Sequence, residues 1–394
     1  MNSGILVVVP SRSSFNAFFR EFAAETASCG LRFAVACGPS LHPRLEPSSG
    51  GTEVLSLPSF RSGDPLRIAR AALVLRTIVK RWRPAIVHAH FTTAALIAAI
   101  AKGLRASPCA TWLATFHGLS GTPGAGEPAH RMLAMAEAWA ARRMSVSFVL
   151  NDEDYAHLRA RNPHGHTVRQ SGFGLGCDLP SFDARRFGPE DKLRIRRAFG
   201  LEAAGPVLAF IGRRTAFKGF PQTLAAFQDV RASIPGARLI VAGEPDVLHG
   251  GDAAAAAASS QPGVIDAGWT NDVASVLAVA DLCILPSVRE GMPVSLMEAL
   301  AMGVPCITAA TRGCRDVVRD QVDGIVLQSR HPKVLAASIV SLLQHPDRLA
   351  AMARAAAQGR SRFDRARHVA YQIAAYRRLL AGEHADRLNL PAET

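Results

Sequence analysis

Short, largely apolar runs alternate along this chain with longer stretches of helical periodicity. Three such runs occur early, at Ile5–Val9, Phe33–Cys37 and Ile86–His90. The segments 15–28 and 66–82 instead repeat apolar residues every three or four positions, which predicts amphipathic helices. Strands without polar alternation, separated by helices, indicate a parallel sheet whose two faces are both covered.

This alternation occurs as two successive series. The first continues with strands at 112–116 and 146–150, and the second has strands at 207–211, 238–242, 282–285 and 305–308. We therefore predict an α/β fold with two facing Rossmann-like, doubly wound domains. The predicted boundaries are 1–180 for the N-terminal domain, 181–205 for a polar interdomain connection, 206–365 for the C-terminal domain, and 366–394 for a C-terminal helix and tail that pack back toward the N-terminal domain. Because such sheets bind ligands at the carboxyl ends of their strands, we expect the ligand cleft between the two domains.

Composition supports this picture and narrows the protein class. The 394 residues exceed what one hydrophobic core usually serves, and the 48% hydrophobic and 20% charged content is ordinary for a packed globular protein. The N-terminal apolar run lacks the basic lead of a signal peptide, and no stretch reaches the roughly 18 to 20 apolar residues of a transmembrane helix. We therefore expect a cytoplasmic protein. The seven cysteines form no C-x-x-C pair, which argues against a disulfide framework and a zinc ribbon.

The net charge of +13 is concentrated in the N-terminal half. Residues 1–200 hold 25 Lys and Arg against 14 Asp and Glu, whereas residues 201–394 hold 20 against 18. The predicted helix at 66–82 carries five cations, which either dock on an anionic membrane surface or form a solvated face. Nucleic acid is not expected as a partner, because aromatic residues make up only 6% of the chain and do not interleave with the basic clusters.

Two glutamates lie eight positions apart just after the third strand of the second series, at Glu290 and Glu298. Gly291 and Pro293 shape the loop between them, and a helix that starts near Ser295 exposes backbone N–H groups that favour a negative charge. Carboxylates accept hydrogen bonds from sugar and ribose hydroxyls. The alternative is an ordinary helix start with two surface glutamates.

Glycines and cations follow the first strand of the second series. The segment begins with Gly212 and Arg213 and ends with Lys218 and Gly219. Glycine lets backbone approach a ligand, arginine supplies a planar fork, and lysine supplies a point charge, so the segment fits a pyrophosphate. A solvated basic loop is the alternative.

Together these motifs resemble the family-4 retaining glycosyltransferases of the GT-B fold, in the bacterial polysaccharide-assembly branch. The Glu-x7-Glu element of that family matches Glu290 to Glu298, and its Gly-Arg…Lys-Gly element matches residues 212–219. The resemblance runs from residue 5 to about residue 380. Further matching segments are Ile86–His90, Thr115–Gly118, Gly174–Asp178 and Arg312–Asp316.

The resemblance implies a role for each matched position. Arg213 and Lys218 would hold the donor pyrophosphate and stabilise the leaving nucleotide diphosphate. Glu290 would bind hydroxyls of the transferred sugar and Glu298 would bind the ribose, while His117 would lie close to the reacting face of the sugar. The implied catalytic set is His117, Glu290, Arg213 and Lys218; the implied donor-binding set is Gly212, Arg213, Lys218, Glu290, Gly291, Met292, Pro293, Val294, Ser295 and Glu298.

The resemblance further implies front-face attack assisted by the leaving phosphate, which needs no enzyme nucleophile, no cofactor and no metal. The triplet Asp152-Glu-Asp154 matches the metal motif of the other large glycosyltransferase fold, but it precedes a helical pattern, so we predict helix N-capping. His88 and His90 lack an evident third ligand, so we predict no metal there. Relatives often carry a Gly-Gly pair after the first strand, where this chain has Pro10–Asn16, which puts donor contacts from that loop in doubt.

The sequence therefore predicts a retaining hexosyltransferase that takes its sugar from a nucleotide diphosphate sugar, a UDP-sugar, in the C-terminal domain. The expected acceptor, on the N-terminal side, is a lipid-linked or growing glycan of cell-surface polysaccharide or exopolysaccharide synthesis. The protein would be cytoplasmic and peripheral on the inner face of the membrane. Two alternatives stay open: a non-catalytic assembly factor that binds nucleotide sugar or glycan, and a nucleotide-sugar epimerase on the same scaffold.

Overall fold

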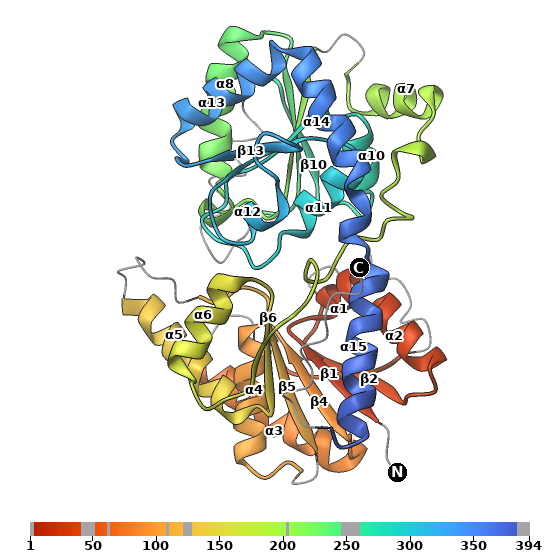
Figure 1. Ribbon diagram of the computed structural model, residues 1–394, viewed down its shortest axis with the longest axis vertical. Helices are drawn as coiled ribbons and strands as arrows, with labels where there is room; N and C mark the ends of the chain where they lie inside the picture. Colours follow the sequence, from red (N-terminus) through yellow and green to blue (C-terminus); the bar gives the residue numbers. More distant parts are fainter. Residues whose placement is uncertain are drawn as a thin grey trace. The chain divides into compact units, whose positions relative to one another are not determined.

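The computed structural model describes residues 4–40, 52–60, 64–107, 110–120, 128–201, 205–245 and 261–383. These residues form two compact units, each built on one parallel sheet (Figure 1). The first unit comprises Met1–Gly174 and Arg367–Thr394, and the second comprises Leu175–Ala366. The segment 181–205, expected as a connection, lies within the second unit, and the residues after 366 belong to the first.

The first unit is a seven-stranded parallel sheet with strand order β3-β2-β1-β4-β5-β6-β7. Helices α3, α4 and α5 pack side by side on one face, while α1, α2 and the C-terminal helix α15 cover the other (Figure 1). Its elements are β1 (Ile5–Val9), α1 (Arg12–Phe18), α2 (Arg20–Ser28), β2 (Phe33–Cys37), β3 (Glu53–Ser56), α3 (Pro65–Trp82), β4 (Ile86–His90), α4 (Thr92–Gly103), β5 (Thr111–Phe116), α5 (Pro128–Arg143), β6 (Val146–Val149), α6 (Asp152–Arg161), β7 (Thr167–Arg169) and most of α15 (Arg365–Leu380).

The second unit repeats the arrangement with six parallel strands in the order β10-β9-β8-β11-β12-β13. Helices α8 and α13 pack together on one face, and α10, α11 and α14 lie on the other (Figure 1). Its elements are η2 (Ala184–Arg186), α7 (Pro189–Ala198), β8 (Val207–Ile211), η3 (Ala216–Lys218), α8 (Phe220–Ser233), β9 (Arg238–Ala242), β10 (Val264–Gly268), α10 (Val273–Ala278), β11 (Leu282–Leu285), α11 (Val294–Ala301), β12 (Cys306–Ala309), α12 (Cys314–Val317), β13 (Gly324–Leu327), α13 (Pro332–Leu343), α14 (Pro346–Gln358) and η5 (Arg360–Phe363).

The central strands form because their apolar runs are buried on both faces of each sheet. Every residue of β1, β2, β4 and β8 is buried. The strands that the apolar pattern did not predict are β3, β7, β10 and β13, and they are the edge strands of the two sheets. Most of them are partly exposed, as in β3 and β10, because an edge strand has one neighbour and needs no continuous apolar run.

Helix α3 shows how local sequence sets the ends of an element. Asp64 is the N-cap, and its side chain accepts a hydrogen bond from the Leu66 N–H at 2.8 Å. Pro65 occupies the first helical position, where its missing N–H costs nothing. Arg83 ends the helix in the left-handed region at φ +51°. None of the described helices is long and apolar enough to span a membrane.

Candidate functional site

The second unit brings the segments after three neighbouring strands together at one edge of its sheet, the edge formed by the carboxyl ends of the strands. β8, β11 and β12 lie side by side and run parallel, so the segments that follow them leave the sheet on the same side. The strand order reverses between β8 and β11: β8 pairs with β9 on one side, and the chain crosses over to β11 on the other. Parallel α/β sheets bind ligands at such a switch point. The predicted donor residues of the second unit follow these strands.

Two glycines make room for the loop after β11, one in the segment after β8 and one in the segment after β12. Gly219 has φ +73°, and a Cβ atom there would lie 2.3 Å from the carbonyl oxygen of Pro286. Gly313 has φ +76°, and its Cβ would lie 2.6 Å from the carbonyl oxygen of Gly291 and 2.7 Å from that of Glu290. A side chain at either glycine would displace the loop that carries Glu290.

Lys218 and Glu290 meet at this edge of the sheet. The Lys218 ammonium donates to Glu290 Oε1 at 2.6 Å, and the Ser287 hydroxyl donates to the same oxygen at 2.7 Å. The side chains of Lys218 and Glu290 are only 18% and 11% exposed. The structure therefore joins two residues that sequence analysis had assigned to different parts of the donor. It also adds Ser287, to which the sequence analysis had assigned no role.

The two arginines after β8 lie in different surroundings. Arg213, the predicted phosphate ligand, is exposed beside Gly212. Arg214 is buried and pairs with Asp266 of β10 through two hydrogen bonds, one of them 2.6 Å from Nη1 to Oδ2. These bonds lower the pKa of Asp266. Arg214 thus ties the β8 segment to an edge strand, a role that no local sequence pattern could reveal.

The loop and helix after Glu290 present backbone to the same edge. Gly291, Met292 and Pro293 are buried, and Val294 and Ser295 open α11. Pro293 stands at the N-cap and supplies no side-chain hydrogen bond. The first N–H groups of a helix with such a cap are suited to a negatively charged ligand.

Glu298 has other neighbours than Glu290. It is half-buried within α11, and burial raises its pKa to about 8; Arg365 partly offsets the rise, and the carboxylate of Asp178 adds to it. The backbone of Cys177 fixes this group, since its N–H donates to the Phe363 carbonyl at 2.6 Å and its carbonyl accepts from the Arg365 N–H at 3.0 Å. Glu298 is therefore protonated in much of its population near neutral pH. A protonated carboxyl can both donate to and accept from a hydroxyl.

The first unit gathers histidines at the equivalent switch point, between β1 and β4. His88 and His90 lie on the same face of β4, with ring centroids 4.1 Å apart, and both are buried. His88 bonds through both ring nitrogens, to the Tyr376 hydroxyl at 2.6 Å and the Thr115 hydroxyl at 2.8 Å. Burial lowers the pKa of His88 to about 3, with further lowering by neighbouring histidines. His88 is thus a neutral core residue that fastens α15 to the sheet.

His117 follows β5 and contacts this cluster. Its Nε2 lies 3.1 Å from Nδ1 of His90, and its ring stacks on Phe91 with centroids 4.2 Å apart. His117 is half-buried, and burial lowers its pKa to about 3, with a smaller contribution from His368. The predicted catalytic histidine is therefore neutral at physiological pH and held on two sides.

Two buried carboxylates hold the loop that carries His117. Both carboxylate oxygens of Glu137 accept from the Ser120 N–H at 2.9 Å. Asp154 accepts from the Leu119 N–H at 3.2 Å and from the Asn151 amide at 3.0 Å. Sequence analysis had assigned these carboxylates no part in the site, because their partners are backbone groups brought near by the fold.

The Asp-x-Asp triplet does not cap α6 as predicted. The N-cap is the preceding residue, Asn151, whose side chain accepts from the Asp154 N–H at 2.8 Å. Asp152 instead pairs with Arg169 at 2.6 Å. Within the described ranges, no group of three or more His, Cys, Asp or Glu residues is placed to hold a metal ion.

The loop after β1 forms the start of α1. Ser11 is the N-cap, and its hydroxyl accepts from the Ser14 N–H at 3.2 Å. The Arg12 N–H donates to the Gly38 carbonyl at 3.0 Å. Serine thus supplies the helix start after β1, where the family resemblance had led us to compare the chain with a glycine pair.

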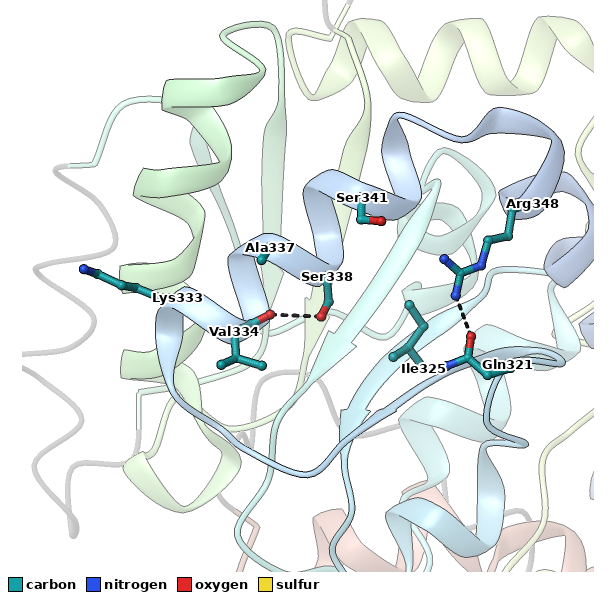
Figure 2. Close-up of a pocket in the computed structure, with 8 residues that line it drawn as sticks. All are labelled: Gln321, Ile325, Lys333, Val334, Ala337, Ser338, Ser341 and Arg348. Carbon is teal, nitrogen blue, oxygen red and sulfur yellow. Dashed lines mark hydrogen bonds between the residues drawn. The ribbon is translucent and has the colours of Figure 1, made fainter.

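A hollow of about 500 Å³ lies beside β13, α13 and α14 of the second unit, away from this edge (Figure 2). None of the predicted site residues lines it. The residues that line it are Gln321, Ile325, Lys333, Val334, Ala337, Ser338, Ser341 and Arg348.

The raised pKa of Glu298 predicts a pH-dependent stability. Because the folded state keeps this proton to a higher pH than the unfolded chain, the free energy of unfolding should fall as pH rises from 4.5 toward about 8. Glu298→Gln cannot ionise and should lose about 1–3 kcal/mol less over that range than the parent. Urea denaturation near both ends of the range measures the difference. Parallel pH profiles for the two proteins would contradict the raised pKa.

Comparison with known proteins places this geometry in a family. Residues 15–171 match the model described as "Glycosyl transferase 4-like domain", and residues 205–345 match "Glycosyl transferases group 1". The D-inositol 3-phosphate glycosyltransferase of Segniliparus rotundus is 31% identical over 327 residues, which are 80% of this chain and 71% of that protein. The UDP-Gal:alpha-D-GlcNAc-diphosphoundecaprenol alpha-1,3-galactosyltransferase of Escherichia coli is 23% identical over 264 residues, 66% of each chain.

Solved structures show the same fold. Anabaena HepE in complex with UDP-glucose matches 96% of this chain and 99% of its own, with a TM-score of 0.75 and 17% identity. The predicted GT-B class of two Rossmann-like parallel-sheet units is confirmed. With both family models matched and a 31% identical relative aligned along most of its length, the chain belongs to the group 1, family-4 glycosyltransferases and is a glycosyltransferase.

Proposed function

We propose that this glycosyltransferase transfers a sugar from a UDP-sugar, with retention of anomeric configuration, to a lipid-linked glycan acceptor in cell-surface polysaccharide synthesis. The observation that carries the proposal is the Lys218–Glu290 pair at the switch point of the second sheet. The two charged groups lie 2.6 Å apart, and a cation beside a carboxylate suits a ligand that has both a diphosphate and sugar hydroxyls.

Two further features support a nucleotide diphosphate sugar as donor. Arg213 is exposed in the segment that links β8 to Lys218, and α11 begins in the segment after β11 with no side-chain cap on its first N–H groups. Together they supply charge-assisted and dipolar contacts for two phosphates. The names of the E. coli relative and of the HepE complex both include a UDP-sugar, which favours uridine as the nucleoside of the donor.

The contacts of Glu290 argue against a role as an enzyme nucleophile. One of its oxygens already accepts from Lys218 and from Ser287. A carboxylate held by two donors suits a fixed hydrogen-bond acceptor better than an attacking group, because both bonds would weaken as it gave up charge. In our proposal the leaving phosphate accepts the proton of the incoming hydroxyl, while Lys218 and Arg213 stabilise the charge on the UDP. The reaction needs no metal and no cofactor.

Donor binding tests the assignment of the second unit. Lys218→Ala should weaken UDP and UDP-sugar at least about tenfold, a loss of about 1.4 kcal/mol, because a charge-assisted phosphate contact is removed. Glu290→Gln should weaken the UDP-sugar but not UDP, since it loses a sugar contact and releases Lys218 for the phosphates. Isothermal titration calorimetry with UDP, UDP-glucose, UDP-galactose, GDP and ADP measures both effects.

Lys333→Ala is the matched control, because it removes an exposed lysine of the same unit in the hollow of Figure 2. It should bind UDP like the parent. Equal losses in Lys218→Ala and Lys333→Ala would sink the assignment of the pyrophosphate site.

Product analysis tests the reaction itself. With a UDP-sugar and a polyprenyl diphosphate-linked sugar acceptor, the product should keep the anomeric configuration of the donor, read from its proton NMR coupling. His117→Ala should lower the transfer rate by about 100-fold with little change in UDP affinity. An inverted product would overturn retention. An isomerised donor formed without acceptor would identify an epimerase, and tight donor binding without turnover an assembly factor.

The outer face of α3 supports a membrane-borne acceptor. Leu66 is 81% exposed and Leu73 is 54% exposed. With Arg70, Lys80 and Arg81 they form one stripe, the α3 stripe, about 22 Å long at the helical rise of about 1.5 Å per residue. The helix contains no acidic residue. Exposed leucines between cations suit the surface of an anionic bilayer, where apolar side chains enter the interface and cations meet phosphates.

Vesicle sedimentation tests this surface. The protein should bind phosphatidylglycerol-containing vesicles, bind pure phosphatidylcholine vesicles weakly, and dissociate as salt is raised. Arg70→Glu should lower binding at least about fivefold, because each cation near such a surface contributes about 1 kcal/mol. Leu66→Ser with Leu73→Ser should lower it further. Arg20→Glu makes the same charge change on α2, so an equal effect there would reduce the α3 stripe to general electrostatics.

A further inference from the structure

His90 and His117 share a hydrogen bond in which only one of the two can be the donor. Nδ1 of His90 lies 3.1 Å from Nε2 of His117. Burial lowers the pKa of both residues, so both rings are neutral and each carries one proton. A neutral imidazole has one N–H donor and one bare nitrogen. The hydrogen bond therefore allows two arrangements: either His90 donates from Nδ1, or His117 donates from Nε2.

The far nitrogen of His90 decides between them. His90 is 1% exposed, and its Nε2 is buried with no hydrogen-bond partner among the residues that the structure describes. Phe19 and His88 pack against the ring, at centroid distances of 4.5 Å and 4.1 Å. If Nε2 carried the proton, an N–H donor would be buried without an acceptor, which is unfavourable and rarer in proteins than an unfilled acceptor.

The lower-energy arrangement therefore puts the proton of His90 on Nδ1, from which it donates to Nε2 of His117. His117 then carries its own proton on Nδ1. The Phe91 ring, stacked at 4.2 Å, holds the imidazole plane, so the bond to His90 also sets the direction of the other ring nitrogen. No described residue bonds to that nitrogen, and His117 is half-buried.

We propose that His90 is a positioning residue that fixes His117 as its Nδ1–H tautomer and so makes it a neutral hydrogen-bond donor to a substrate oxygen. This role rests on the proposed function only in that His117 meets the substrate. The occupied Nε2 cannot act as a general base. The Nδ1–H can stabilise negative charge on an oxygen of the bound sugar or of its acceptor without taking up a proton.

His90 differs in this respect from its neighbour on the strand. Both ring nitrogens of His88 have hydroxyl partners, which can donate or accept and so accommodate either tautomer. Among the described residues, His90 has a hydrogen-bond partner on Nδ1 and none on Nε2, so His90, unlike His88, favours a single tautomer. The two histidines of β4 therefore have separate roles, one in fastening α15 and one in orienting His117.

The tautomer can be measured without any substrate. Long-range ¹H–¹⁵N correlation spectra of the full chain with ¹⁵N-labelled histidine separate a protonated ring nitrogen from a bare one, and the loss of one ring pattern in His117→Ala assigns His117. The unmodified protein should show His117 protonated on Nδ1 and bare on Nε2. A proton on Nε2 of His117 overturns the proposal, whatever donor the enzyme uses.

Variants of His90 test the positioning role. His90→Asp places a carboxylate oxygen, an acceptor, near the position of Nδ1, so Nε2 of His117 should become protonated, and kcat should fall about 10- to 100-fold with KM for the donor nearly unchanged. His90→Asn, whose amide can place an N–H near the position of Nδ1, should restore the tautomer and much of kcat. A bare Nε2 on His117 in folded His90→Asp contradicts the proposal.

The readouts separate this proposal from the proposed function. If UDP-sugars fail to bind while His117 still shows the Nδ1–H pattern, the donor assignment falls and the positioning role stands. If donor binding and transfer are as expected but His117 carries its proton on Nε2, only the positioning role falls.

Discussion

The parallel pairing of β8 with β11 is the constraint on which the donor side of this protein depends. These two strands are adjacent in the sheet but not consecutive in the sequence, and the strand order reverses between them. The segments that follow them therefore leave the same edge and meet there. One ends in Lys218 and the other contains Glu290, so the topology itself produces the pair of opposite charges. The sheet of the first unit reverses between β1 and β4 and places its histidines at the same kind of junction.

The Lys218–Glu290 pair is largely shielded from water, so a ligand that separates the two charges has to supply a new partner for each of them. Both side chains are less than one fifth exposed, and a charge this shielded from water needs a partner of opposite charge. In the proposed function, a diphosphate replaces the carboxylate as the partner of the ammonium, and sugar hydroxyls replace the ammonium as donors to the carboxylate. The proposal therefore favours a sugar diphosphate, which has both groups in one molecule, over a phosphate alone.

Burial favours the uncharged form of ionisable side chains in both units. In the first, burial lowers the pKa values of His88, His90 and His117 and keeps these rings neutral. In the second, burial raises the pKa of Glu298 and favours its neutral acid. Both effects replace charge with directed hydrogen bonding. The proposed function instead assigns the diphosphate and the sugar to the cations Lys218 and Arg213 and to the carboxylate Glu290.

The sequence by itself determined the central strands, the two-unit α/β class and the loops that hold Glu290, Lys218 and His117, because apolar runs and glycine-rich strand ends are local features. It missed the edge strands β3, β7, β10 and β13, where one missing neighbour removes the need for such a run. Only the tertiary structure decided the partners. Lys218 and Glu290 are 72 positions apart, and His88 and Tyr376 are 288 apart. Three further features likewise depend on which strands are neighbours: the Arg214–Asp266 pair, the carboxylates that hold the His117 loop, and the burial of Nε2 of His90. The strand order is set by packing of the whole sheet.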